Sequence, residues 1–258
     1  MDNVIDRIFA DCKGILAADE SSPTIKKRLE SVGKESTIET RHSYRHNLFS
    51  TEGLSKYIGG VILFEETLKS PETLGPLKDQ GIVLGIKVDQ GTSPYGDEGG
   101  KLTNGLHGLL ERLHEYKDLG AEFAKWRAVI SVTDDDKCIF ANSLALGHYA
   151  HACHQAGMVP IVEPEVLMDG EHDIYDSFEK TERAIHFLFE SLYHLGVNIE
   201  KIILKPNMVM HGYKNLFTST PEDVALATLN CFKRCVPAAV PAIAFLSGGQ
   251  PDDLAISS

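Results

Sequence analysis

The sequence of 258 residues contains no run of about 18 apolar residues, the length that a membrane-spanning helix requires. Its N-terminus also lacks the basic, then apolar, then small-residue pattern of a secretory signal. Positive charge is scarce: 25 Lys and Arg stand against 37 Asp and Glu, which gives a formal net charge of −12. Nucleic-acid-binding domains instead present a basic face. We therefore expect a cytoplasmic protein that binds neither membrane nor nucleic acid, in which local clusters of Lys and Arg hold any anionic substrate.

Cysteine is also sparse. The five cysteines are odd in number and widely spread, which indicates reduced thiols in a cytosolic compartment rather than a disulfide framework. Cys231 and Cys235 lie four residues apart on an expected helix, where buried packing is more typical than metal binding.

Short apolar runs alternate with longer helical patterns along the whole chain, as in βα units around a parallel sheet. The runs span residues 14–18, 59–64, 81–89, 123–130, 158–163, 201–209 and 242–249. Helices are expected over residues 22–33, 39–50, 106–119, 139–156, 177–195 and 221–236, and a glycine-rich loop over residues 91–105. No Gly/Ser-rich or Pro-rich linker divides the chain, so we expect residues 1–258 to form one domain.

Seven such repeats predict an α/β fold, a TIM (β/α)8 barrel that lacks its eighth βα unit. A doubly wound sheet is the alternative. That fold favours a G-x-G-x-x-G phosphate-binding turn after an early strand, and the sequence contains none.

Lys205 stands out because it lies in the apolar run of residues 201–209, which Pro206 interrupts at once. A strand buried on both faces reads as unbroken Val, Ile and Leu. A lysine in such a run costs free energy unless its surroundings pair or neutralise it. One interpretation is a strand-end lysine whose amine snorkels to water. The other is a nucleophilic amine, which the rest of the chain favours.

Polar residues gather where the apolar runs end, at the edge on which barrel enzymes build their active sites. They are Asp19, Lys87, Asp89, Lys125, Arg127, Glu163, Glu165, Lys205 and Ser247. Strand alternation places Lys125 and Arg127 on one side and Trp126 on the other. A neighbouring ammonium and a low-dielectric site both favour the neutral amine of Lys205, the form that adds to carbonyls. Glu163 or Glu165 could then transfer protons.

Two groups of residues at this edge could bind phosphate. The segment Ser247-Gly248-Gly249 offers a hydroxyl and backbone N–H groups after the seventh strand, a frequent phosphate site in barrels. Lys87 and Arg127, with Ser21 and the helix start beyond it, could hold a second phosphate.

A metal-dependent mechanism is the competing chemistry. His148, His151 and His154 fall three apart on one expected helix, and zinc could polarise a carbonyl without a Schiff base. That helix lies outside the barrel, however, and no carboxylate–histidine cluster stands at a strand end. We therefore expect no metal and no other cofactor, and interpret the three histidines as a partly exposed helix face.

Seven motifs occur in order along the chain. They are Leu16-Ala17-Ala18-Asp19-Glu20-Ser21, Gly60-Val61-Ile62-Leu63-Phe64, Gly85-Ile86-Lys87-Val88-Asp89, Phe123-Ala124-Lys125-Trp126-Arg127, Val162-Glu163-Pro164-Glu165, Leu204-Lys205-Pro206-Asn207-Met208-Val209 and Phe245-Leu246-Ser247-Gly248-Gly249-Gln250. In order and spacing they resemble class I fructose-bisphosphate aldolases from start to finish. One motif alone is weak, but seven in sequence are highly specific.

The resemblance implies a lyase of glycolysis and gluconeogenesis. It would reversibly cleave fructose 1,6-bisphosphate to dihydroxyacetone phosphate and glyceraldehyde 3-phosphate through a lysine Schiff base. By motif match, Lys205 would form the Schiff base and Glu163 would be the acid/base residue. Lys125 would assist carbinolamine chemistry, Asp19 would act on the C4 hydroxyl, and Glu165 would be a supporting carboxylate.

The resemblance also implies how sugar phosphates bind. The residues that it assigns to substrate are Ser21, Thr24, Arg28, Lys87, Arg127, Ser247 and Gly248, with Arg28 closing on the substrate. It implies a homo-oligomer, a tetramer in the family.

The family continues with an eighth strand, whose Gly-Arg binds the phosphate beside Ser247, and with a mobile tail that ends in tyrosine. We expect that without them the barrel has open backbone edges. The alternative function is therefore a weakly active or inactive aldolase that serves as an interaction scaffold or is a fragment. Within the enzymes, no local feature distinguishes fructose 1,6-bisphosphate from fructose 1-phosphate.

Overall fold

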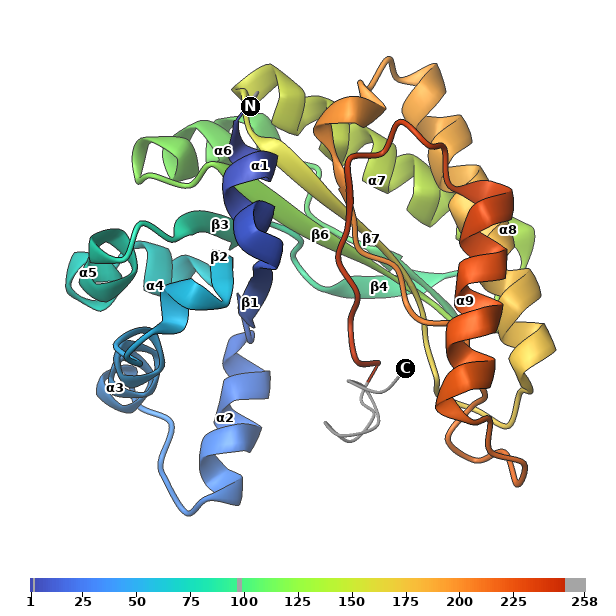
Figure 1. Cartoon of the computed structure of the whole chain (residues 1–258), viewed down its shortest axis with the longest axis horizontal. Coiled ribbons are helices and arrows are strands. Elements are labelled where there is room, and N and C mark those ends of the chain that lie inside the picture. Colours follow the sequence, from blue (N-terminus) through green and yellow to red (C-terminus); the bar gives the residue numbers. More distant parts are fainter. Residues whose placement is uncertain (2, 97–98, 249–258) are drawn as a thin grey trace.

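A curved parallel sheet of seven strands forms the centre of the computed structural model, which describes residues 1, 3–96 and 99–248 (Figure 1). In order across the sheet, the strands are β1 (Gly14–Ala18), β2 (Ile58–Leu63), β3 (Val83–Lys87), β6 (Phe123–Ile130), β7 (Val159–Val166), β8 (Ile203–Leu204) and β9 (Ala242–Ile243). Every neighbouring pair is parallel. This is the TIM-barrel-like α/β architecture that the repeats predict, with β1 and β9 at the two edges of the sheet.

Most of the helices lie outside the sheet (Figure 1). The helices are α1 (Val4–Phe9), α2 (Ser22–Ser31), α3 (Ile38–Phe49), α4 (Glu65–Leu68), α5 (Pro71–Asp79), α6 (Leu109–Asp118), α7 (Asp136–Ala156), α8 (Ile174–His194) and α9 (Pro221–Cys235), with short 3-10 turns at Ala10–Cys12, Leu54–Lys56 and Ile199–Lys201. Local sequence explains their starts. At α9, Thr220 accepts a hydrogen bond from the N–H of Asp223 in a capping box, and Pro221 occupies the first turn. None of the helices in the described ranges combines the length and apolar composition needed to cross a membrane.

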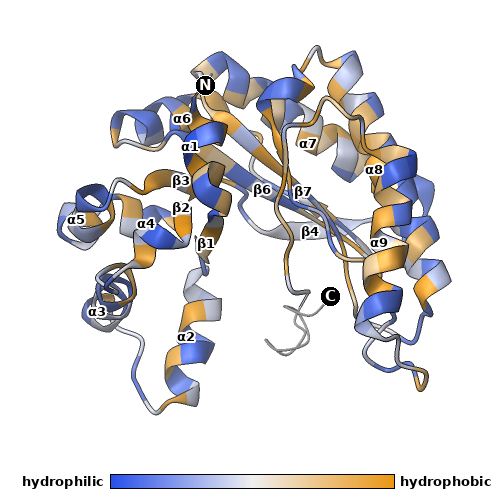
Figure 2. Cartoon of the chain, in the orientation of Figure 1, coloured by the Kyte–Doolittle hydropathy of each residue, from blue (hydrophilic) through white to orange (hydrophobic). Residues whose placement is uncertain are grey.

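The larger apolar core fills the space between the strands and the outer helices. In Figure 2, β2 and β3 are largely hydrophobic, whereas the helices carry both kinds of residue, as amphipathic elements covering a buried sheet should. Trp126 of β6 belongs to this core and stacks on Tyr149 of α7, with ring centroids 5.6 Å apart. The outer face of β6 is thereby fixed against the helical layer.

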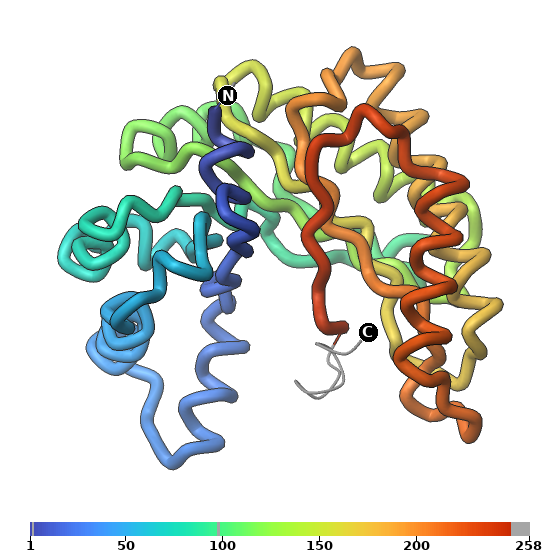
Figure 3. The backbone as a smooth tube through the Cα atoms, viewed as in Figure 1, coloured from blue at the N-terminus to red at the C-terminus, as the bar shows by residue number. Residues whose placement is uncertain are grey.

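A second, smaller core closes the floor of the barrel, at the amino ends of the strands. Val4 and Ile8 of α1 pack there with Phe123, Ile161 and other apolar strand residues. Figure 3 shows this N-terminal segment lying across the strands. The approach at Gly59 is so close that a Cβ atom there would lie 1.9 Å from the carbonyl oxygen of Ile8. Only glycine fits this contact.

Three expected elements differ from the structure. Where a loop is predicted over residues 91–105, the chain forms a hairpin of β4 (Thr92–Tyr95) and β5 (Gly100–Thr103). The glycines lie around and between its strands and obscure the alternating pattern. The strands predicted over residues 201–209 and 242–249 are shortened to two residues each, β8 and β9. Pro206 has no N–H with which to continue the β8 ladder.

Candidate active site

Lys205 and Glu163 form the centre of the site. Glu163 lies on β7, and Lys205 directly follows β8, the next strand of the sheet. The backbone N–H of Lys205 donates to the carbonyl oxygen of Val162 at 2.8 Å, which extends the ladder by one bond. Nζ of Lys205 donates to Oε1 of Glu163 at 2.5 Å, and the two side chains are only 14% and 3% exposed. The amine therefore binds a buried carboxylate instead of snorkelling to water.

Glu163 also lies beside a second lysine. Its Oε2 atom is 3.3 Å from Nζ of Lys125, as an ion pair without hydrogen-bond geometry. Nζ of Lys125 lies 2.7 Å from Oδ2 of Asp19, at the end of β1. Burial opposes the protonated form of Lys125, but the carboxylates of Glu163 and Asp19 raise its pKa above the ordinary value. Lys125 is therefore an ammonium at neutral pH, in contact with two carboxylates.

Strand alternation explains how these side chains meet. Phe123 and Ile161 point into the barrel at its floor. Lys125 and Glu163 lie two residues further along the same strands, so they point to the same interior nearer the rim. Trp126 faces the opposite way, into the outer core. This confirms the sides on which the sequence pattern places Lys125 and Trp126.

Further out, the cations of the rim are each held by a carboxylate. Nε of Arg127 donates to Glu165, and Nζ of Lys87 donates to the carboxylate and, at 2.9 Å, to the backbone oxygen of Asp89. Burial opposes the charged form of Arg127, but the hydrogen bond to Glu165 raises its pKa. Arg127 therefore stays charged, and a bound phosphate would compete with these carboxylates for the side chains of Arg127 and Lys87.

The predicted residues of α2 form a separate group. Ser21 precedes the helix, and its hydroxyl lies 3.2 Å from that of Thr24. Arg28 has a 60% exposed side chain and forms an ion pair with Glu20. In the described part of the chain these contacts keep the three residues together beside Asp19, and do not join them to Lys87 or Arg127.

The turn after β9 carries Ser247 and Gly248. Ser247 is exposed, and Gly248 has a φ of 60°, a left-handed conformation that favours glycine. The hydroxyl of Tyr213 donates to the carbonyl oxygen of Gly248 at 2.5 Å. Gly249 and Gln250, which complete the predicted motif, lie outside the described residues.

Sequence reasoning missed several residues that hold the site. Tyr213 and Asn207 follow Lys205 in the chain, and Arg45 and Glu66 support the turn after β1. For Asn207 a signal existed, since a polar residue directly after a buried Lys-Pro needs partners of its own. No sequence pattern distinguishes the buried Arg45 from an exposed arginine on a helix.

The three histidines of α7 lie away from this site. His148 and His151 are exposed, and Nδ1 of His151 lies 3.0 Å from the carbonyl oxygen of Leu195 at the end of α8. Nε2 of His154 lies 3.3 Å from the carbonyl oxygen of Lys201. Across the described ranges, no three or more His, Cys, Asp and Glu side chains form a group suited to a metal ion. The polar side chains around Lys205 are lysines and carboxylates, which suit Schiff-base chemistry.

Comparison with known proteins agrees with this geometry. A family model described as fructose-bisphosphate aldolase class-I matches residues 1–257. A probable fructose-bisphosphate aldolase class 1 of Xanthomonas campestris pv. campestris is 48% identical over 255 residues, which are 95% of this chain and 76% of that protein. Fructose-bisphosphate aldolase C of Homo sapiens is 46% identical over 257 residues, covering 96% of this chain and 71% of that protein.

A solved structure is similar over nearly the whole chain. It is the fructose-bisphosphate aldolase from Plasmodium falciparum, crystallised as a ternary complex with TRAP and a small-molecule inhibitor. The TM-score is 0.97 and the identity 42%, with 99% of this chain and 77% of that chain covered. With its strand-end motifs assembled around Lys205, this chain belongs to the class I fructose-bisphosphate aldolases.

Proposed function

We propose that Lys205 is the nucleophile with which this class I aldolase reversibly cleaves fructose 1,6-bisphosphate. The observation that carries the proposal is the contact between the Lys205 amine and the buried carboxylate of Glu163. At 2.5 Å, Glu163 is placed to take a proton from the ammonium and leave a neutral amine. That amine would add to the C2 carbonyl of the sugar and form a carbinolamine.

Proton transfers then follow from the neighbouring groups. Glu163 returns its proton to the carbinolamine hydroxyl, which leaves as water and forms an iminium on Lys205. The Lys125 ammonium lies beside the same carboxylate and stabilises negative charge there. Asp19 would accept the proton of the C4 hydroxyl while the C3–C4 bond breaks and its electron pair enters the iminium. Glyceraldehyde 3-phosphate leaves first, and protonation and hydrolysis of the enamine release dihydroxyacetone phosphate.

Two phosphate positions complete the proposed substrate site. Ser247 and the N–H of Gly248 would bind one phosphate, and Lys87 with Arg127 would bind the other. Ser21, Thr24 and Arg28 would approach that second phosphate from α2. Glu165 holds Arg127 in the free site and would support the lysines electrostatically. The separate α2 group supports a role for Arg28 as a residue that closes on substrate, because its side chain is exposed.

We also propose that residues 1–258 form one domain of a cytoplasmic, homo-oligomeric enzyme of glycolysis and gluconeogenesis that needs no metal or cofactor. The net charge of −12, the five unpaired cysteines and the family membership support this setting.

Borohydride trapping tests the chemistry. Dihydroxyacetone phosphate and sodium borohydride should add the reduced substrate mass to the peptide containing Lys205, and K205R should not be labelled. An adduct on another lysine, or none, would overturn the assignment. Comparing cleavage of fructose 1,6-bisphosphate with cleavage of fructose 1-phosphate then decides the preferred sugar.

A further inference from the structure

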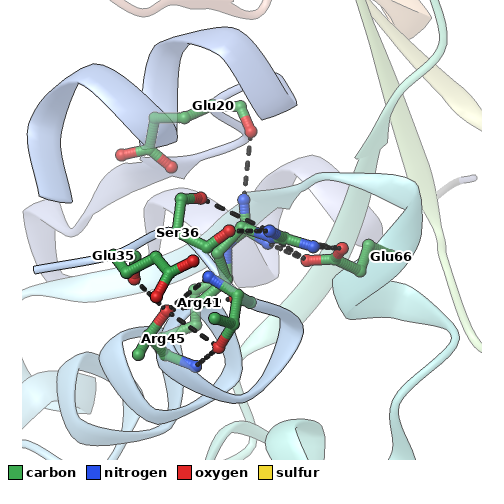
Figure 4. Close-up of polar contacts among 8 residues, drawn as sticks. Glu20, Glu35, Ser36, Arg41, Arg45 and Glu66 are labelled. Carbon is green, nitrogen blue, oxygen red and sulfur yellow. Dashed lines mark hydrogen bonds and ion pairs between the residues drawn. The ribbon is translucent and has the colours of Figure 1, made fainter. Parts of the chain in front are cut away.

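Arg45 is a buried arginine that contacts the turn carrying Asp19. Its side chain, on α3, is only 1% exposed. Nη2 donates to the backbone carbonyl oxygen of Glu20 at 3.0 Å, and Nη1 donates to Oε1 of Glu66 at 3.2 Å (Figure 4). One guanidinium thus joins the turn after β1 to α4, the helix that follows β2.

Glu66 is itself fixed from a second direction. Nε of Arg41 lies 3.0 and 3.2 Å from its two oxygens, and Nη2 of Arg41 lies 2.6 Å from Oε2 (Figure 4). Burying the Arg45 guanidinium is costly unless a carboxylate and hydrogen bonds compensate its charge. Glu66 and the Glu20 carbonyl provide part of that compensation, and among the described residues Nε of Arg45 has no hydrogen-bond partner.

Arg45 contacts the backbone of Glu20, which lies between two residues of the site. Glu20 separates Asp19, which contacts Lys125, from Ser21, the N-cap residue of α2. The side chain of Glu20 binds Arg28 instead, so two different arginines hold its carbonyl oxygen and its carboxylate. A shift of this peptide unit would move the Asp19 carboxylate away from the buried lysines, and a displacement of about 1 Å can cost about 100-fold in rate.

We propose that Arg45 is a positioning residue for the bond-breaking step, which it serves by fixing the Glu20 carbonyl and hence the Asp19 carboxylate. This role rests on the proposed function, because it assigns Asp19 to the C4 hydroxyl. Arg45 does not contact the site of imine formation at Lys205. Its removal should therefore impair cleavage of the six-carbon sugar more than imine formation with dihydroxyacetone phosphate, which has no C4 hydroxyl.

The test compares two rates in one protein. In R45M, kcat for cleavage of fructose 1,6-bisphosphate should fall at least 10-fold, while borohydride trapping with dihydroxyacetone phosphate should stay within about twofold of the parent. R183M is the matched control, because Arg183 pairs with Asp136 on the outer surface. It should leave both rates unchanged. In a D19N background, R45M should cause less than a further twofold loss, because the group it positions is already disabled.

A general structural role would lower both rates together, or would add its full effect to that of D19N, and either result overturns the proposal. If R45M does not fold, R45K and E66Q are measured in its place. For each, the ratio of the cleavage rate to the trapping rate should fall at least threefold relative to the parent. An unchanged ratio in these two variants overturns it as well. Absence of a Lys205 adduct in the parent would instead refute the proposed function. A parent that traps and cleaves normally, with an unchanged ratio in the variants, refutes only the positioning role.

Discussion

The side chain of Asn207 replaces a missing backbone bond between β7 and the segment after β8: its Oδ1 accepts from the N–H of Val166 at 3.0 Å. Pro206 interrupts the backbone ladder just before this point. The Nδ2 group of Asn207 donates to the hydroxyl of Thr181 on α8, also at 3.0 Å. This buried amide therefore ties the residues after Lys205 both to the neighbouring strand and to the helix outside.

Removing this amide should destabilise the fold. N207A leaves the N–H of Val166 and the hydroxyl of Thr181 buried without partners, each at a cost of about 1 to 3 kcal/mol. We expect the free energy of unfolding in urea to fall by about 2 to 6 kcal/mol. N230A, at an exposed position of α9, is the control and should change it by less than about 0.5 kcal/mol. Equal effects of the two variants would contradict the role of Asn207.

Neutralising Glu163 should stop proton transfer while leaving the site folded. E163Q cannot take the Lys205 proton, and it leaves two lysines around one neutral amide. We expect borohydride trapping to slow by about 100-fold or more, the usual contribution of general acid–base catalysis. Circular dichroism should confirm that the variant folds. Trapping at the parental rate would show that another group serves Lys205.

The contact between Tyr213 and Gly248 should affect substrate affinity. Y213F removes the hydroxyl that holds the turn after β9, at a cost of about 1 kcal/mol. If that turn binds phosphate, KM for fructose 1,6-bisphosphate should rise about fivefold with little change in kcat. Y193F, at an exposed position of α8, is the control. A fall in kcat at constant KM would indicate a different role for the hydroxyl.

Glu66 should make stability depend on acid. Hydrogen bonds from Arg41 lower its pKa below the ordinary 4.5, even though burial opposes this. A group with a lowered pKa contributes stability above its unfolded value, and loses that contribution as pH falls through the folded value. E66Q should therefore be less stable than the parent at pH 7 by about 3 kcal/mol, because Arg45 loses its carboxylate. Below pH 4.5 the two proteins should converge in urea titrations. The exposed E52Q should match the parent throughout.

The close approach of α1 to β2 gives a prediction for the barrel floor. In G59A the new Cβ would overlap the Ile8 carbonyl, so α1 must move away and expose Val4 and Ile8. We expect a loss of at least about 2 kcal/mol of unfolding free energy. G14A is the control, since a Cβ at Gly14 meets no atom within 4 Å. A G59A protein as stable as G14A would contradict the tight packing.

The outline of the fold was predictable because each strand carries its own local signal. The apolar run of β2, the alternating pattern of β6 and the capped helix α9 can each be recognised without tertiary information. Side-chain alternation likewise predicts that Lys125 and Trp126 face opposite sides of β6. The lengths of β8 and β9 were not predictable, because they depend on partners far away in the chain. The hairpin of β4 and β5 is hidden by its glycines.

The supporting contacts of the site were even less accessible to sequence reasoning. Arg45 becomes important only because α3 places it beside the backbone of Glu20, 25 residues away. The pairing of Lys87 with Asp89 and of Arg127 with Glu165 also depends on geometry, since each charge has several possible partners at the rim. Residue types predict which charges gather at the rim, whereas backbone placement decides which of them pair.

The floor of the barrel has a consequence for biosynthesis. Ile8 shares its cluster with Ile203, so roughly 200 residues must be translated between the two halves of one small core. At cellular elongation rates of about 5 to 20 residues per second, about 10 to 40 s pass between the synthesis of α1 and the synthesis of Ile203. The first helix to leave the ribosome is thus among the last to reach its final packing, and until then its apolar face is open to chaperones.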